Sequence, residues 1–231
     1  MGIIPKNTII EFNGLPGVGK STITHCLEDL ANKQGIPFYK KYYQYSFEHR
    51  TILLLLHPFL FSLFPSIMHF ANCYGRGRQK YRYVVGFLAY VREYLDFKKD
   101  IKNGLLVSDQ GMVQDFISIA HDSSIKDLGT VSSILSKLEK RNIRFIRVDC
   151  NLSEVDVLDR LRNRVNGGSR IEKNDDDEVI RLLNIQKRNL ELVRQELNKS
   201  SESFHITIDT SVSPYDNACF IWKMIYGKTE K

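Results

Sequence analysis

The chain has 231 residues, of which 42% are hydrophobic and 26% are charged. This length and apolar content suffice for one well-filled core, and they argue against a disordered chain. The formal net charge of +6 suits a protein that handles polyphosphates, although a nucleic-acid binder or an ordinary solvated surface would also fit it. Composition therefore favours a single globular domain.

The four cysteines are scattered, at Cys26, Cys73, Cys150 and Cys219. Because they form no C-x-x-C pair and no zinc-ligand spacing, neither a disulfide framework nor a zinc site is predicted. Such cysteine usage is typical of a reducing compartment, and we expect a cytoplasmic protein. The first residues, MGIIPKNTII, do not have the pattern of a signal peptide.

Apolar, β-branched runs alternate with helical patterns along the chain. The predicted strands cover residues 7–12, 36–43, 105–109, 144–149 and 204–209. The predicted helices cover residues 20–34, 49–103 (in several parts), 128–141, 153–164 and 177–198, and a last helix holds Trp222 in the core. Gly35 suits a helix C-terminus, and Ser153 fits the N-cap of a capping box. Strands joined by long helical crossovers predict a parallel sheet that is covered on both faces.

The segment TILLLLHPFLFSLFPSIMHFA, residues 51–71, is long and apolar enough to raise the question of a membrane span. Pro58 and Pro65 would leave backbone groups unsatisfied in lipid, so we predict two short buried helices with a kink between them and no membrane contact. If this segment has an exposed apolar face, a homodimer interface is the alternative.

The strongest motif is GLPGVGKS, residues 14–21, which fits G-x-x-x-x-G-K-[ST] between a predicted strand and a predicted helix. Its glycines allow a tight turn with inward N–H groups, and the helix adds its positive end. Lys20 is expected to reach the β- and γ-phosphates, and Ser21 to bind Mg²⁺. The predicted phosphate-binding residues are Gly14, Pro16, Gly17, Val18, Gly19, Lys20, Ser21 and Thr22.

A second motif, LLVSDQGMVQD, places Asp109 at the carboxyl end of a predicted strand. Ligands bind at this edge of parallel sheets, so Asp109 could hold the water shell of Mg²⁺ or orient an attacking hydroxyl. The alternative is a simple helix cap. Gln110 is expected to contact the acceptor, and Asp115 to lie on the surface of the next helix.

A third motif, DRLRNRVNGGSRIE, carries Arg160 and Arg164 on one helix face and Arg170 beyond two glycines. A flexible segment of this kind, at about 160–178, can close over phosphates as a lid and stabilise charge on the transferring group. The alternative is a solvated helix with surface salt bridges.

Basic residues alternate with tyrosines in YGRGRQKYRY, residues 74–83. Arg76 and Arg78 could bind a phosphate of the acceptor, and Arg92 in the following helix is a further candidate. Nucleic-acid contact and a plain exposed loop are the alternatives.

The order of these motifs, with a final IDTSVSP, resembles the thymidylate kinase-like branch of the P-loop nucleoside monophosphate kinases. The resemblance implies one kinase domain over residues 1–231, with a helical acceptor-side insert at about 44–104. It also implies a three-layer α/β P-loop fold, with a five-stranded parallel sheet of order 2-3-1-4-5 and helices on both faces. The departure is Asp109-Gln110-Gly111, since these kinases usually have Asp-Arg-Tyr or Asp-Arg-Ser there.

We therefore predict a phosphotransferase that uses ATP and Mg²⁺ and acts on a small acceptor, either a nucleotide or a nucleoside. Its predicted catalytic residues are Lys20, Asp109, Arg160, Arg164 and Arg170. Two other classes stay open. One is a nucleotide-dependent switch whose partner surface is the 51–71 segment, and the other is a kinase of nucleic-acid ends that uses the 74–83 segment.

Overall fold

The computed structural model describes residues 8–40, 57–101, 104–141, 145–163, 171, 174–199 and 204–227. Five parallel strands form one sheet in the order β2-β3-β1-β4-β5, which confirms the predicted order. The strands are β1 (Thr8–Asn13), β2 (Phe38–Tyr39), β3 (Leu105–Ser108), β4 (Ile146–Asn151) and β5 (Phe204–Asp209). Strand β1 is central and buried along its whole length.

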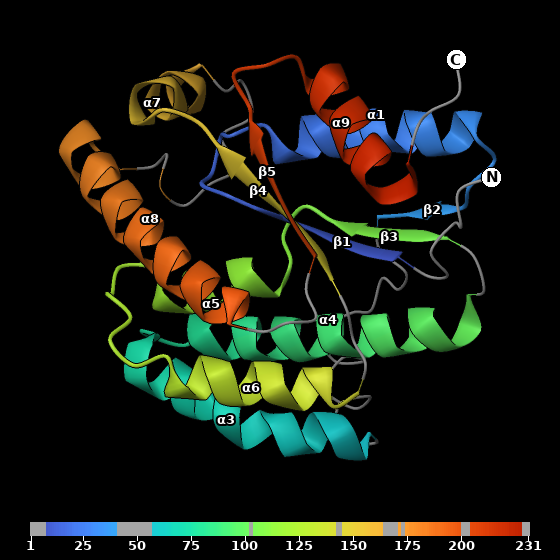
Figure 1. Cartoon of the computed structure of the whole chain (residues 1–231). Coiled ribbons are helices and arrows are strands. Elements are labelled where there is room, and N and C mark those ends of the chain that lie inside the picture. Colours follow the sequence, from blue (N-terminus) through green and yellow to red (C-terminus); the bar gives the residue numbers. More distant parts are fainter. Residues whose placement is uncertain are drawn as a thin grey trace.

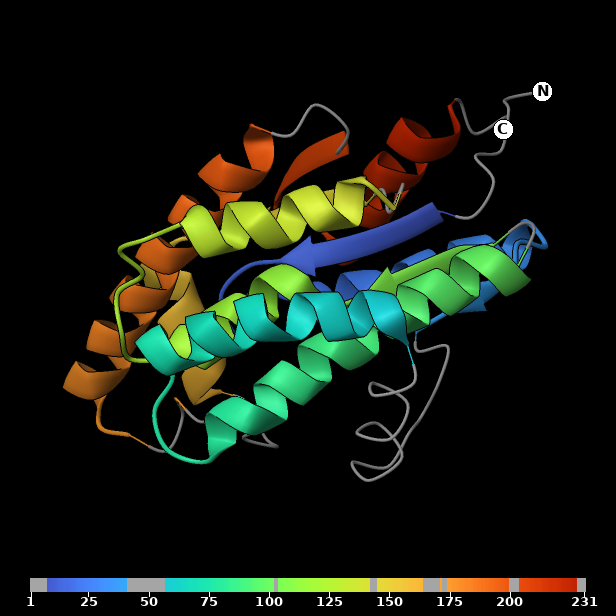
Figure 2. The same ribbon diagram turned by 90° about the horizontal axis from the view of Figure 1, so that it is seen from below.

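Helices cover both faces of this sheet, as Figure 1 shows. One face carries α1 and α9, and the other carries α4 and α5, with α3 and α6 beyond them (Figures 1 and 2). The helices are α1 (Lys20–Lys33), α3 (Pro58–Tyr74), α4 (Gln79–Asp100), α5 (Met112–Ala120), α6 (Gly129–Glu139), α7 (Glu154–Arg162), α8 (Asp176–Asn198) and α9 (Pro214–Tyr226). The predicted three-layer α/β P-loop fold is therefore present.

Successive side chains of β1 point to opposite faces of the sheet, and each face has its own hydrophobic core. Ile10 and Phe12 belong to the core beneath α1 and α9, whereas Ile9 belongs to the core beneath α4 and α5. Because successive side chains of a strand point to opposite faces, Glu11 lies on the same face as Ile9. A carboxylate is thus placed on the α4 and α5 side of the central strand.

Helix α3 is one continuous helix, so the prediction of two short helices is wrong over residues 58–71, and residues 51–56 lie outside the described part. Pro65 lies inside this helix and cannot donate a backbone hydrogen bond. Lys137 of α6 donates to the Ser62 carbonyl at 3.0 Å and contacts Ser66 Oγ at 3.2 Å, next to this interruption.

One face of α3 is part of the core, and the opposite face is open. Leu63 and Phe70 are fully buried, whereas Phe61 and Phe64 are 63% and 44% exposed. The predicted homodimer interface on this segment stays a prediction. No helix in the described residues is both long and apolar enough to cross a membrane.

Two further expectations about local structure are corrected. The second strand is much shorter than the predicted 36–43, and residues 41–43 lie outside the described part. Asp115 is buried, at 9% exposure, where a surface position was predicted. The predicted caps are confirmed, since Ser153 accepts a hydrogen bond from the Asp156 amide and Gly35 has a positive φ at the end of α1.

The two faces of α3 lead to a paired prediction. Replacing buried Phe70 by alanine should lower the free energy of unfolding by about 3–5 kcal/mol, because it leaves a cavity in the core. Replacing exposed Phe61 by alanine should change it by about 0.5 kcal/mol or less. Chemical denaturation of both variants tests this, and equal losses would contradict the assignment of the faces.

Candidate functional site

The loops that follow the strands meet at one edge of the sheet. Because all five strands are parallel, their carboxyl ends share this edge, where open α/β sheets bind ligands. The loop after β1 holds the glycine-rich motif, and the turn after β3 holds Asp109. The loops after β4 and β5 lie next to them, and Thr210 donates from its backbone amide to the Asn151 carbonyl at 2.9 Å.

The glycine-rich loop needs glycine for two separate reasons. Gly17 and Gly19 have φ values of 83° and 95°, a region that favours residues without a side chain. A Cβ atom on Gly14 would lie 2.8 Å from the Cys150 carbonyl oxygen, so the loop and β4 approach too closely for any larger residue. The loop is therefore seated tightly on the neighbouring strand.

Lys20 begins helix α1 and folds back over the loop. Its ammonium donates to the carbonyl oxygens of Gly14 and Leu15, at 2.8 and 2.9 Å. The first turn of α1 contains no acidic side chain. The positive end of the helix and the Lys20 ammonium therefore both act on the same space, and this arrangement suits a polyphosphate.

Ser21 connects this loop to the end of β3. Its hydroxyl donates to Asp109 Oδ2 at 2.6 Å. A hydroxyl and a carboxylate side by side are hard oxygen ligands, and Mg²⁺ prefers such ligands and keeps several waters in addition. The donor set therefore fits Mg²⁺ at the position where the sequence predicted it. No group of three or more histidine, cysteine or acidic side chains that could hold a metal ion occurs among the described residues.

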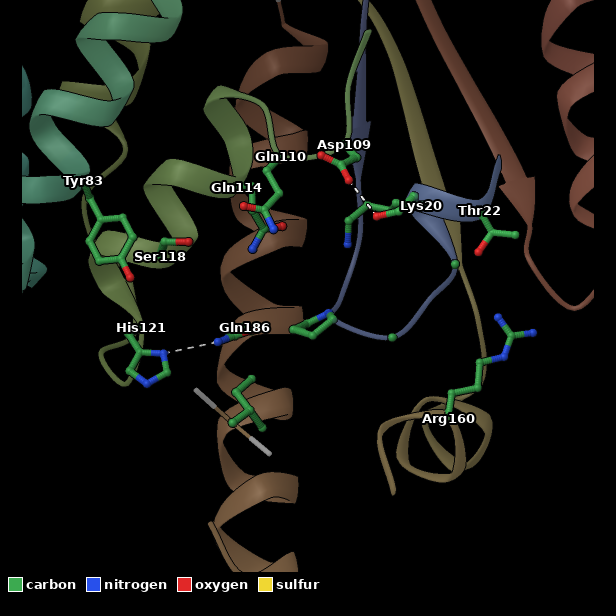
Figure 3. Close-up of a pocket in the computed structure, with 15 residues that line it drawn as sticks. Lys20, Thr22, Tyr83, Asp109, Gln110, Gln114, Ser118, His121, Arg160 and Gln186 are labelled. Atoms are coloured by element: carbon green, nitrogen blue, oxygen red, sulfur yellow. Dashed lines mark hydrogen bonds between the residues drawn. The ribbon is translucent and has the colours of Figure 1, made fainter. Parts of the chain in front are cut away.

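A cavity of about 480 Å³ extends from this loop toward α4, α5 and α8 (Figure 3). Its wall on the loop side contains Pro16, Gly17, Gly19, Lys20, Ser21, Thr22, Asp109 and Arg160. Its far wall contains Tyr83, Gln110, Gln114, Ser118, His121, Ile171 and Gln186. One continuous space thus joins a phosphate-binding loop to a second, mostly uncharged region.

The far wall was not predicted from the sequence, apart from Gln110. Gln110, Gln114 and Ser118 are four residues apart, and this spacing puts them on one side of α5 and of the turn before it. This spacing could have been recognised in the sequence. Gln186 offered none, because it comes from α8 and is distant in sequence.

Two amide groups of the far wall are poorly satisfied within the protein. The Oε1 atoms of Gln114 and Gln186 are buried and have no hydrogen-bond partner among the described residues. The Gln186 side-chain nitrogen lies 3.4 Å from His121 Nδ1. Buried amide oxygens without a donor are costly, so they suit a ligand that brings one.

Arg160 lies at the loop side of the cavity, but it is held by backbone oxygens. Its guanidinium donates to the Thr210 carbonyl at 2.9 Å and contacts the Val18 carbonyl at 3.4 Å. It therefore links α7 to the glycine-rich loop and to the loop after β5. Its catalytic role stays a prediction.

The predicted acceptor-side arginines Arg76, Arg78 and Arg92 do not line this cavity. Arg76 pairs with Asp122 at 2.9 Å, and Arg92 pairs with its helix neighbour Asp96 at 2.6 Å. Arg78 precedes α4 and is exposed, and none of the three lines the cavity. Arg164 and Arg170 lie outside the described residues, as do residues 165–169, 172 and 173 of the predicted lid at 160–178.

The close contact between the glycine-rich loop and β4 leads to a prediction that can be tested beside a matched control variant. Gly14→Ala should weaken ADP binding about tenfold or more, or about 1.4 kcal/mol, because the loop must move away from Cys150. Gly35→Ala also puts a side chain at a positive φ, 65° against 156° at Gly14, but no atom lies within 4 Å of its Cβ position. It should lower stability by about 1 kcal/mol and leave ADP affinity unchanged. Calorimetric titration compares the two variants, and equal losses of affinity would contradict the prediction.

Comparison with known proteins supports the fold. No family model matches the chain, and no curated protein sequence matches it. A solved structure, the deoxyadenosine kinase from M. mycoides with bound dATP, superposes with a TM-score of 0.52 and 16% sequence identity. The alignment covers 94% of this chain and 99% of that one. The chain thus has the fold of a P-loop kinase, and this neighbour does not single out the thymidylate kinase branch.

Proposed function

We propose that the protein is a nucleoside kinase that transfers the γ-phosphoryl group of ATP to a hydroxyl of a nucleoside. The observation that carries this proposal is one continuous cavity whose two ends differ in the chemistry of their side chains. One end holds Lys20, Ser21 and Asp109 around a phosphate-binding loop, and the other end presents uncharged polar side chains. A donor phosphate chain and an acceptor could then meet within one continuous cavity.

The character of the far wall favours an acceptor without a phosphate of its own. Among the described residues of this wall, no lysine or arginine occurs, and histidine is the one side chain that can become cationic. The arginines Arg76, Arg78 and Arg92, which were expected to bind an acceptor phosphate, lie elsewhere. The buried amide oxygens of Gln114 and Gln186 suit a base edge that carries N–H donors. A nucleoside fits these features better than a nucleoside monophosphate.

The chain's own residues would act by positioning and by electrostatics. Lys20 and the loop amides would stabilise negative charge on the β- and γ-phosphates. Ser21 and Asp109 would hold Mg²⁺, which neutralises phosphate charge when bound. Orienting the acceptor hydroxyl and receiving its proton is the other role that we propose for Asp109. We place this reaction in the cytoplasm, in keeping with the four free cysteines.

The two competing classes have less support. A switch protein would not need the polar far wall of the cavity. A kinase of nucleic-acid ends would need a basic surface beside the site, and the arginines of the 74–83 segment do not line the cavity.

An acceptor screen tests the proposed function directly. The purified protein with ATP and Mg²⁺ is mixed with nucleosides, nucleoside monophosphates or oligonucleotides, and release of ADP is followed. We expect at least one nucleoside to raise turnover clearly above background hydrolysis. Stimulation by monophosphates alone would reassign the acceptor, and background hydrolysis throughout would overturn the kinase proposal.

Lys20→Ala gives a second prediction. Loss of the ammonium should reduce kcat/KM by about 10³-fold, or about 4 kcal/mol of transition-state stabilisation. Lys33→Ala is the matched control, since Lys33 lies in the last turn of the same helix, away from the loop. It should retain activity within about twofold. Near-normal turnover by the Lys20 variant would contradict the assignment of the loop.

A further inference from the structure

Glu11 is a buried acidic residue that the proposed reaction does not use. It lies on the central strand β1 and is 1% exposed. It does not line the cavity. We infer that Glu11 is a positioning residue that fixes the turn 109–111 and thereby sets where Asp109 stands at the phosphate site. This inference rests on the proposed function only in taking Asp109 as the residue that serves Mg²⁺.

The first support is a pair of hydrogen bonds to one carboxylate oxygen. Glu11 Oε1 accepts from the Met112 backbone amide at 3.2 Å and from the Tyr94 hydroxyl at 2.6 Å. Met112 is the first residue of α5, and Tyr94 belongs to α4. Glu11 therefore connects the central strand with two helices that contribute to the cavity.

The second support is the contact between Glu11 and Gly111. A Cβ atom on Gly111 would lie 2.4 Å from the Glu11 carboxyl carbon and 2.7 Å from its Oε1 atom. Any side chain at position 111 would collide with Glu11. The φ of Gly111 is −83°, so this glycine is required by the close approach and not by its backbone conformation.

The third support is that Glu11, which lies on strand β1, caps the N-terminus of helix α5. Gly111, the residue before the helix, has no side chain that could accept a hydrogen bond from the first turn. The Glu11 carboxylate takes this place at the positive end of the helix. The start of α5 is thus fixed by β1.

These contacts hold the turn at both ends. In the sheet register, Glu11 is the β1 partner of Ser108, the last residue of β3. Through its side chain it also binds Met112, the first residue of α5. Asp109 and Gln110 lie between these two fixed points. The backbone of these two residues therefore has little freedom to shift relative to Ser21.

The environment of Glu11 argues against a purely space-filling role. Burial raises the pKa of its carboxyl group, and the hydrogen bonds from Tyr94 and Met112 and the nearby Arg147 guanidinium oppose that shift. A buried carboxyl is costly compared with an apolar side chain of similar size. A residue needed only for packing would not have to be acidic.

The test measures how Mg²⁺ changes ADP affinity, which needs no turnover and no acceptor. In Glu11→Ala, the Mg²⁺ concentration for half-maximal enhancement of ADP binding should rise about tenfold, because Asp109 is displaced. ADP affinity without Mg²⁺ should stay within about twofold. Glu11→Gln should restore normal behaviour, because its amide oxygen can accept both hydrogen bonds.

Two further variants control for loss of stability. Ile134→Ala removes a fully buried side chain on α6, so it should lower the melting temperature without changing the Mg²⁺ response. Should Glu11→Ala fail to fold, Glu11→Asp takes its place, since it keeps the charge but draws the carboxylate away from the Met112 amide. A normal Mg²⁺ response in Glu11→Asp or Glu11→Ala, or an equal shift in Ile134→Ala, would overturn the inference.

Asp109→Asn separates this inference from the proposed function. If Asp109→Asn leaves the Mg²⁺ response unchanged, then Asp109 does not serve the metal, and the proposed site fails. If Asp109→Asn shifts the response and the Glu11 variants do not, the site stands and the role of Glu11 is refuted.

Discussion

The hydrogen bond between the Ser21 hydroxyl and the Asp109 carboxylate joins two segments that lie 88 residues apart in the chain. It can form only because β1 and β3 are parallel neighbours, so that the loop after one strand and the turn after the other leave the sheet at the same edge. The near end of the cavity, and with it the proposed phosphate site and the proposed place for Mg²⁺, depends on this pairing.

The parts of the site that are local in sequence could be predicted. The glycine-rich loop carries its own signal, and Asp109 is marked by the buried strand before it. The four-residue spacing of Gln110, Gln114 and Ser118 was present and could have revealed part of the far wall. Gln186 could not be found in this way, because only the packing of α8 against α5 brings it to the cavity.

The fold was more predictable than the acceptor site, for a physical reason. The strands and their parallel arrangement follow from apolar runs and helical crossovers, which are visible in the sequence, whereas the strand order came from the family resemblance. Whether an arginine can bind an acceptor depends on the direction in which its long side chain extends from the helix. Arg92 illustrates this, because it sits on the predicted helix but turns to Asp96. Likewise, the basic composition of the 74–83 segment does not show which of its arginines forms an ion pair with an acidic residue.

The contact between Glu11 and Gly111 has a consequence for how this sequence can change. The two positions form an interlocked pair, in which a larger residue at 111 and glutamate at 11 exclude each other. A serine or tyrosine at position 111, as expected from the family resemblance, would collide with Glu11 unless the residue at position 11 were smaller or moved away. This contact therefore favours glycine at position 111 as long as position 11 is glutamate, and it places no such constraint on Gln110.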